Sequence, residues 1–243
     1  MSLWVKICGN TSLDDALLAA DAGADAVGFV FGPSPRRVTP QQVAAIVPAL
    51  PAALEKIGVF VDASFEEIGS TIQSAALTGV QLHFNAAPSL SAALRQRFGP
   101  ALRILRVVHF DTHQRAGSLV SGHDFGRVEI AAGAEGVLAP EEPFTDPNID
   151  AILVDSRTAT ATGGTGQTFD WSAARSTLFR DVGRKKPLVA AGGLSPENVA
   201  EAIATLQPWG VDVVSGIEAA PGRKDPARVR AFIASARFVS SRK

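Results

Sequence analysis

Short runs of hydrophobic residues alternate with longer amphipathic stretches along most of the chain. The runs contain few polar residues, which is typical of parallel strands that are buried on both faces. The stretches between them are rich in alanine and predict helices, the first capped by Thr11 or Ser12. We expect strands at residues 4–8, 26–31, 56–61, 79–83, 103–109, 151–156, 187–191 and 211–214, and helices at residues 11–22, 65–76 and 88–98 and from about residues 39, 195 and 226.

Eight strands followed by helices favour a closed (β/α)₈ barrel, an α/β fold also called a TIM barrel, over an open doubly wound sheet. The chain has 243 residues, close to the usual size of about 250 for such barrels. No linker divides the chain, so we expect residues 1–243 to form a single domain with an eight-stranded parallel barrel. Residues 110–150 are too long for one helix and its loops, and we expect a helix plus an insertion after the fifth strand.

Composition and charge exclude several classes of protein. The formal net charge is −1, so we expect no nucleic-acid partner and no membrane surface. We also expect no signal peptide and no membrane span, because no apolar run reaches about 18 residues. The single cysteine, Cys8, excludes an intramolecular disulfide and favours a reducing, cytoplasmic setting. The histidines show no metal-ligand spacing, so we expect no metal.

The strand at 151–156 carries the most informative residues. In (β/α)₈ barrels the active site lies at the carboxyl ends of the strands, and this strand delivers Asp155 there. An acid beside a glycine-rich loop that can meet a phosphate indicates a sugar-phosphate enzyme. Burial would raise the pKa of Asp155 and suit it to act as a general acid, whereas the alternative is a helix cap or a structural ion pair. The loop consists of Gly163, Gly164, Thr165 and Gly166.

Cys8 ends the first strand and is the candidate general base. A thiolate can remove a proton from carbon, but position alone supports a small buried hydrophobic residue equally well. Lys6 shares the face of Cys8, because side chains alternate along a strand. If that face points inward, Lys6 needs a partner, for which Asp212 is the candidate, although Asp212 could instead bind a substrate hydroxyl. Otherwise Lys6 would lie near the open lower rim of the barrel.

Other strand ends supply candidate binding groups. We expect the glycine-rich loop to bind phosphate together with two further segments, Gly192–Gly193 and Ser215–Gly216, which follow the last two strands. Arg36 could clamp a carboxylate through two hydrogen bonds, while we expect its neighbour Arg37 to be solvated. Three residues are weaker candidates for lining the pocket: Gln81, His83 and Asp212.

These motifs, taken together, resemble the phosphoribosylanthranilate isomerase family of tryptophan biosynthesis. The matching blocks follow one order over nearly the whole chain. They are Lys6-Ile-Cys-Gly9, Ser34-Pro-Arg36, Gly58-Val-Phe-Val61, Val80-Gln-Leu-His83, Leu153-Val-Asp-Ser156, Gly163-Gly-Thr-Gly166, Phe169-Asp-Trp171, Ala191-Gly-Gly-Leu-Ser-Pro-Glu-Asn198, Gly210-Val-Asp-Val213, Ser215-Gly-Ile-Glu218 and Gly222-Arg-Lys-Asp225.

The resemblance implies a (β/α)₈ barrel that performs an Amadori rearrangement without metal or organic cofactor, an aldose–ketose isomerisation. It implies that Asp155 opens the ring of N-(5-phosphoribosyl)anthranilate and that Cys8 removes the proton from ribose C2. It also implies that Arg36 holds the anthranilate carboxylate and that the glycine segments hold the phosphate. The sequence departs from the family pattern at Phe84, where glycine is usual, and at Val214, where serine is frequent.

Two alternatives remain at this point. One is another isomerase that acts on a phosphosugar in a barrel of this kind. Aminoimidazole-ribotide isomerase performs the same rearrangement with two carboxylates, whereas Cys8 stands in the base position here. The other is a barrel that binds a phosphoribosyl ligand without converting it, which turnover would exclude. The sequence makes no prediction about protein partners.

Overall fold

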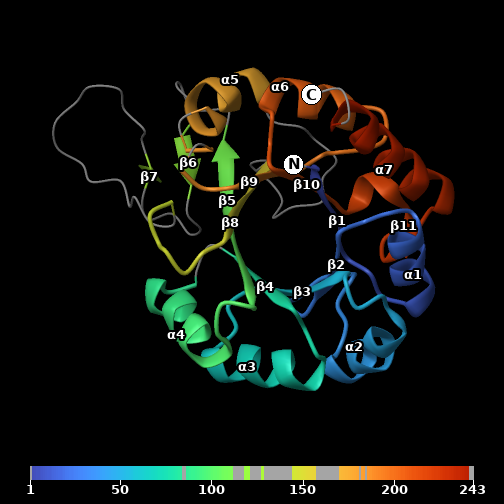
Figure 1. Ribbon diagram of the computed structural model, residues 1–243, viewed down its shortest axis with the longest axis vertical. Coiled ribbons are helices and arrows are strands. Elements are labelled where there is room, and N and C mark those ends of the chain that lie inside the picture. The colour runs from blue at the N-terminus through green and yellow to red at the C-terminus, as the bar shows by residue number, and fades with distance from the viewer. Residues whose placement is uncertain are drawn as a thin grey trace, which may run out of the picture.

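The computed structural model describes residues 2–83, 86–111, 118–120, 127–128, 144–156, 170–180, 182–183 and 185–240. Within these residues, parallel strands form a closed barrel with a ring of helices outside it (Figure 1). The first and last strands of the barrel pair with each other, and this pairing closes it. The barrel strands are β1 (Trp4–Ile7), β2 (Ala26–Val30), β3 (Glu55–Phe60), β4 (Gly79–Leu82), β5 (Arg103–Asp111), β8 (Ala151–Ser156), β9 (Leu188–Ala190) and β10 (Gly210–Val213). This arrangement confirms the predicted eight-stranded barrel.

Side-chain oxygen atoms cap the first three helices. Ser12 caps the first, Thr39 forms a capping box with Gln42, and Ser64 forms one with Glu67, so orphan backbone N–H groups are satisfied. The helices are α1 (Leu13–Asp21), α2 (Pro40–Ile46), α3 (Phe65–Ser74), α4 (Pro88–Phe98), α5 (Trp171–Ala174), α6 (Val199–Leu206) and α7 (Pro226–Ser240). Short helical turns follow α2 and α5: η1 (Val47–Ala49) and the π-helical η2 (Arg175–Phe179). No helix in these ranges is long and apolar enough to cross a membrane.

The helix expected from about residue 195 begins at Val199 instead. The side chain of Asn198 explains the shift, because it accepts a hydrogen bond from the Ser195 backbone N–H and donates one to the Gly193 carbonyl. These two bonds fold the intervening residues as turns. The α5 and η2 segment was not among the expected helices, since its apolar positions do not show a long helical repeat.

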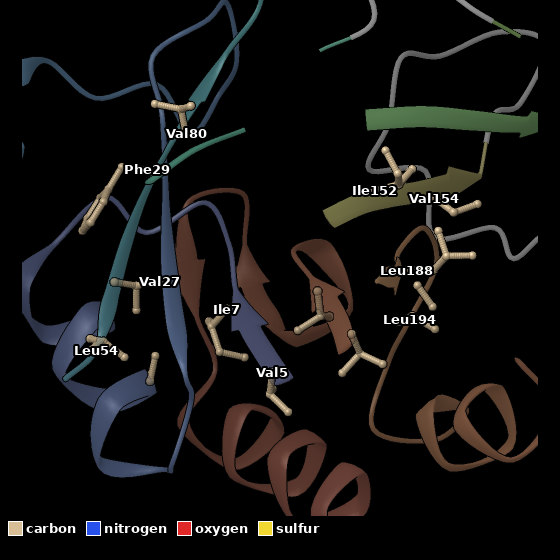
Figure 2. Close-up of a cluster of buried hydrophobic side chains, with 14 of the residues drawn as sticks. Val5, Ile7, Val27, Phe29, Leu54, Val80, Ile152, Val154, Leu188 and Leu194 are labelled. Atoms are coloured by element: carbon tan, nitrogen blue, oxygen red, sulfur yellow. The ribbon is translucent and has the colours of Figure 1, made fainter. Parts of the chain in front are cut away.

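Alternating side chains along each strand form two hydrophobic clusters. The larger one lies between the strands and the helices, and Figure 2 shows members such as Val5 and Ile7 of β1. The smaller one fills the inside of the barrel. Its members are Trp4, Ala26, Ile57, Leu105, Val107, Ala151, Leu153, Val189 and Ala191. This alternation fixes which residues point into the barrel, including those at the upper ends of the strands.

Two small antiparallel additions extend beyond the barrel. The pair β6 (Ser118–Val120) and β7 (Arg127–Val128) continues the sheet from β5. β5 pairs with β8 as far as Phe110 and runs on to Asp111, where it pairs with β6. The rest of the helix plus insertion expected within 110–150 falls largely outside the described residues. The hairpin of β11 (Glu218–Ala220) and β12 (Arg223–Lys224) follows the last barrel strand.

Candidate active site

Lys6 lies inside the barrel with no exposed surface. Its Nζ donates hydrogen bonds to Asp212 Oδ1 at 2.8 Å and to Gln81 Oε1 at 2.9 Å. Lys6 and Asp212 are also register partners on β1 and β10, so the sheet itself brings the two charges together. The expected partnership of Lys6 with Asp212 is therefore present, and the lower-rim alternative is wrong.

The charge of Lys6 is stabilised by its neighbours. Burial by itself would lower the pKa of Lys6, but the charges of Asp212 and Cys8 more than offset it and raise that pKa above its ordinary value. A cation therefore stands inside the barrel, immediately below the carboxyl ends of the strands. Such a buried cation is tolerated only because hydrogen-bonding partners surround it.

Cys8 follows β1 on the same inner face and is buried. Gly28 of β2 makes the space for it, because a Cβ atom at this glycine would lie 2.5 Å from Cys8 Sγ and 3.0 Å from Lys6 Cε. Burial raises the pKa of the Cys8 thiol, and Lys6 opposes that rise by favouring the thiolate. The sulfur is thus held within the electrostatic reach of two ammonium groups, those of Lys6 and Lys224.

Asp155 stands near the carboxyl end of β8, on the inner face that it shares with Leu153. It is partly exposed, and its register partner on β5 is the buried His109. The ring of His83, at the end of β4, lies 6.4 Å from that of His109. Burial and the charge of Lys6 lower the pKa of His83 to about 4, so His83 is neutral near pH 7.

Arg36 is paired with Glu218. Its Nε and Nη2 atoms donate to the two carboxylate oxygens at 2.8 and 2.6 Å, a bidentate geometry. Lys224 Nζ also donates to Glu218 at 3.2 Å and to the Cys8 carbonyl oxygen at 2.6 Å. The hairpin β11–β12 therefore connects the candidate carboxylate clamp with the candidate base. Arg37 is exposed, as expected.

The loops after β9 and β10 pack closely against each other. Gly192 and Gly193 both adopt left-handed backbone angles, with φ of 79° and 64°. A Cβ atom at Gly216, which follows Ser215, would lie 1.9 Å from the Leu194 carbonyl oxygen, so only glycine allows this approach. Two of the three expected phosphate-binding segments are thus adjacent. The third, Gly163 to Gly166, lies outside the described residues, as does Phe84.

Sequence reasoning assigned no role to Glu218 and Lys224. The available signal was a pair of opposite charges flanking the Pro221–Gly222 turn, with more charges nearby in the same segment. That signal is weak, because charges beside a turn are usually solvated. Here Glu218 has only 4% of its side chain exposed and Lys224 has none.

The closed barrel and the acid, thiol and cations gathered at the carboxyl ends of its strands define a (β/α)₈-barrel enzyme. A family model described as N-(5'-phosphoribosyl)anthranilate (PRA) isomerase matches residues 5–119 and 135–235. The chain belongs to the phosphoribosylanthranilate isomerase family.

Relatives and solved structures agree with this assignment. The N-(5'-phosphoribosyl)anthranilate isomerase of Pelobacter propionicus is 41% identical over 98% of this chain and 97% of its own. The crystal structure of the Thermotoga maritima enzyme is 34% identical, covers 97% of this chain and 99% of its own, and has a TM-score of 0.76. A structure of a phosphoribosyl anthranilate isomerase in complex with reduced 1-(o-carboxyphenylamino)-1-deoxyribulose 5-phosphate is 33% identical over the same shares, with a TM-score of 0.73.

Proposed function

We propose that this protein converts N-(5-phosphoribosyl)anthranilate to 1-(2-carboxyphenylamino)-1-deoxyribulose 5-phosphate, an Amadori rearrangement by general acid and base. As a member of its family, the protein is an isomerase of tryptophan biosynthesis. One observation carries the assignment of roles. Cys8 and Asp155 both stand on the inner face of the barrel, at the carboxyl ends of β1 and β8.

Asp155 is the proposed general acid. In its protonated form it gives a proton to the furanose ring oxygen, and the bond from that oxygen to C1 breaks. The anthranilate nitrogen supplies the electron pair, so a Schiff base forms with the nitrogen carrying the positive charge. The position of Asp155 on the inner face of the barrel, near the carboxyl end of β8, supports this role.

Cys8 is the proposed general base. Its thiolate takes the proton from C2, and the electrons of that bond neutralise the Schiff base to give an enolamine. The enolamine then becomes the ketone: the C2 hydroxyl gives its proton to the Asp155 carboxylate and C1 takes one from the Cys8 thiol, so both groups return to their starting forms. Lys6 supports this step because its ammonium charge favours the thiolate over the thiol. The chemistry needs one acid and one base on the same sugar, and the two residues supply one each.

Arg36 and the glycine loops are the proposed anchors at the two ends of the substrate. The guanidinium would bind the anthranilate carboxylate, and the loops containing Gly193 and Gly216 would bind the phosphate together with the Gly163 to Gly166 segment. Gln81, His83 and Asp212 are the proposed pocket lining, with Asp212 and Gln81 acting through Lys6. We propose the reducing cytoplasm as its setting, because the lone Cys8 must stay a thiol.

The test is the consumption of N-(5-phosphoribosyl)anthranilate, generated in place and followed by its fluorescence, with spontaneous hydrolysis subtracted. Wild type should turn over substrate, whereas Asp155→Asn should not, while still binding the reduced product. Near-normal activity of Asp155→Asn would remove Asp155 from its role. Ligand binding by folded wild type without turnover would favour the binding-only alternative over the isomerase.

A further inference from the structure

We propose that Glu218 is a positioning residue that orients Arg36 for the carboxylate of the substrate. This inference rests on the proposed function of Arg36 and extends it to a residue with no assigned role. Glu218 is the centre of a buried cluster. Its carboxylate accepts hydrogen bonds from Arg36 Nε and Nη2, from Lys224 Nζ and from the Gly222 backbone N–H, the last two at 3.2 Å each.

Glu218 carries its charge in this cluster. Burial would raise the pKa of its carboxyl group, but the hydrogen bonds from Arg36 and the charge of Lys224 lower that pKa below its ordinary value. The hydrogen bonds to Glu218 in turn raise the pKa of Arg36. Burial lowers the pKa of Lys224, and the charge of Glu218 opposes that change. With Lys224 protonated, the cluster of two cations and one anion has one net positive charge.

The rest of the cluster fixes the position of Glu218. Lys224 Nζ donates to the Cys8 carbonyl oxygen, and the Thr11 hydroxyl donates to the Gly222 carbonyl oxygen at 2.6 Å. Both bonds dock the hairpin β11–β12 onto the segment that follows β1. The hairpin therefore fixes the position of Glu218 relative to Cys8. The two hydrogen bonds from Arg36 to Glu218 then fix the position of the guanidinium group.

Arg36 is held from two sides as a result. Its Cδ packs over Gly9, where a Cβ atom would lie 2.8 Å away, and its Nε–Nη2 edge faces Glu218. Within the described part of the chain its Nη1 makes no hydrogen bond to protein. The guanidinium thus keeps N–H groups for a ligand carboxylate while its own rotamer is fixed beforehand, which reduces the entropic cost of binding.

A substitution at Glu218 can distinguish two roles of this residue, the orientation of Arg36 and a purely electrostatic effect on the substrate. Glu218→Gln would remove a negative charge next to the site, so a purely electrostatic role predicts tighter binding of the anionic substrate. Loss of orientation predicts weaker binding. We expect weaker binding, by about tenfold, the loss expected when one charge-assisted hydrogen bond is misplaced. KM should rise while kcat changes little, because the clamp holds ground state and transition state alike.

The experiment compares two ligands and three variants. The ligands are reduced 1-(o-carboxyphenylamino)-1-deoxyribulose 5-phosphate and the same compound without its carboxyl group. Glu218→Gln should weaken binding of the first and leave the second unchanged. Glu218→Asp keeps the charge but shortens the side chain, and it should give the same loss. Glu66→Gln is the matched control, because Glu66 of α3 pairs with Arg97 of α4 in an exposed position away from the site, and it should change the binding of neither ligand.

The outcomes separate the inference from the proposed function. Tighter or unchanged binding of the carboxylate compound by Glu218→Gln, or equal losses for both compounds, would overturn the positioning role. Retention of the carboxylate preference by Glu218→Asp would do the same, even where Glu218→Gln fails to fold. If wild type neither turns over substrate nor prefers the carboxylate compound, the proposed function itself fails and the inference falls with it.

Discussion

The sulfur of Cys8 occupies the space that a side chain at Gly28 would need: a Cβ atom there would lie only 2.5 Å from it. Gly28→Ala should therefore displace the sulfur from its place on the inner face of the barrel and, with Cys8 as the proposed base, lower kcat by roughly 100-fold. The overpacked barrel should also lose about 1–3 kcal/mol of unfolding free energy. Steady-state kinetics and denaturant unfolding measure the two effects.

Gly69→Ala is the control for that substitution. Gly69 lies inside α3, where a new Cβ would meet the end of the flexible Arg97 side chain at 3.3 Å and the Phe98 ring at an ordinary contact distance of 3.7 Å. Alanine is the better helix former by about 1 kcal/mol, so this variant should be more stable and fully active. Equal activity of the Gly28 and Gly69 variants would contradict the assigned role of Gly28.

Cys8→Ala distinguishes a general base from a buried hydrophobic residue. If Cys8 is the base, kcat should fall by roughly 10²–10⁴-fold, while the free energy of unfolding changes by only about 1 kcal/mol. Cys8→Ser keeps a side chain of similar shape and should be nearly as inactive. A variant that loses activity only in proportion to its unfolded fraction would support the core-hydrophobe alternative.

Alkylation of Cys8 reports its protonation state without other signals, because the chain contains one cysteine. Burial raises the pKa of this thiol, so Cys8 should still be mostly protonated at a pH where a free thiol is already largely ionised. In that range the rate of Cys8 alkylation by iodoacetamide should rise by about tenfold per pH unit, whereas the rate for a free thiol levels off. Lys6→Met removes a charge that lowers this pKa, so alkylation should slow further at any given pH. Rates measured from pH 7 to pH 10 test both statements.

The same lysine variant should be costly for stability. Lys6→Met leaves Asp212 without its partner inside the barrel, and breaking such a buried pair costs about 3–5 kcal/mol. Combining Lys6→Met with Asp212→Asn should restore much of that loss, because no uncompensated charge remains. If the double variant is no more stable than Lys6→Met alone, the charge of Asp212 is not what destabilises it.

His83 predicts a loss of stability in mild acid. Its pKa in the folded protein is about 4, against 6.5 for the ordinary group. The unfolded chain therefore binds a proton between these values while the folded protein does not, so the free energy of unfolding falls as pH decreases from 6.5 to 4. His83→Asn should make this part of the pH dependence shallower. Urea unfolding at several pH values measures the slope, and an unchanged slope would assign the acid sensitivity to other groups.

The strands of the barrel could be predicted from the sequence because each is a hydrophobic run, so burial on both faces is visible locally. The partner of Lys6 could also be predicted. Strand alternation gives the face to which Lys6 belongs, and Asp212 is a carboxylate near the end of another strand that could neutralise its charge. The pairing of Arg36 with Glu218 could not, because neither stands on a barrel strand, so no strand alternation assigns either side chain to a face. The start of α6 at Val199 depended on two hydrogen bonds of a single Asn198 side chain, which no periodicity reveals.

Because β1 and β10 close the barrel, the first strand cannot complete its pairing until β10, the last barrel strand, has been synthesised. Trp4 pairs with Gly210, and the contact between Lys6 and Asp212 spans 206 positions. During synthesis on the ribosome, Lys6 has no carboxylate to meet until most of the chain has emerged. Contacts of such long range form late and slowly in folding. The electrostatic environment of Cys8 is therefore created only at the end of biosynthesis, so that a prematurely terminated chain would contain the cysteine without the charged residues that surround it in the folded protein.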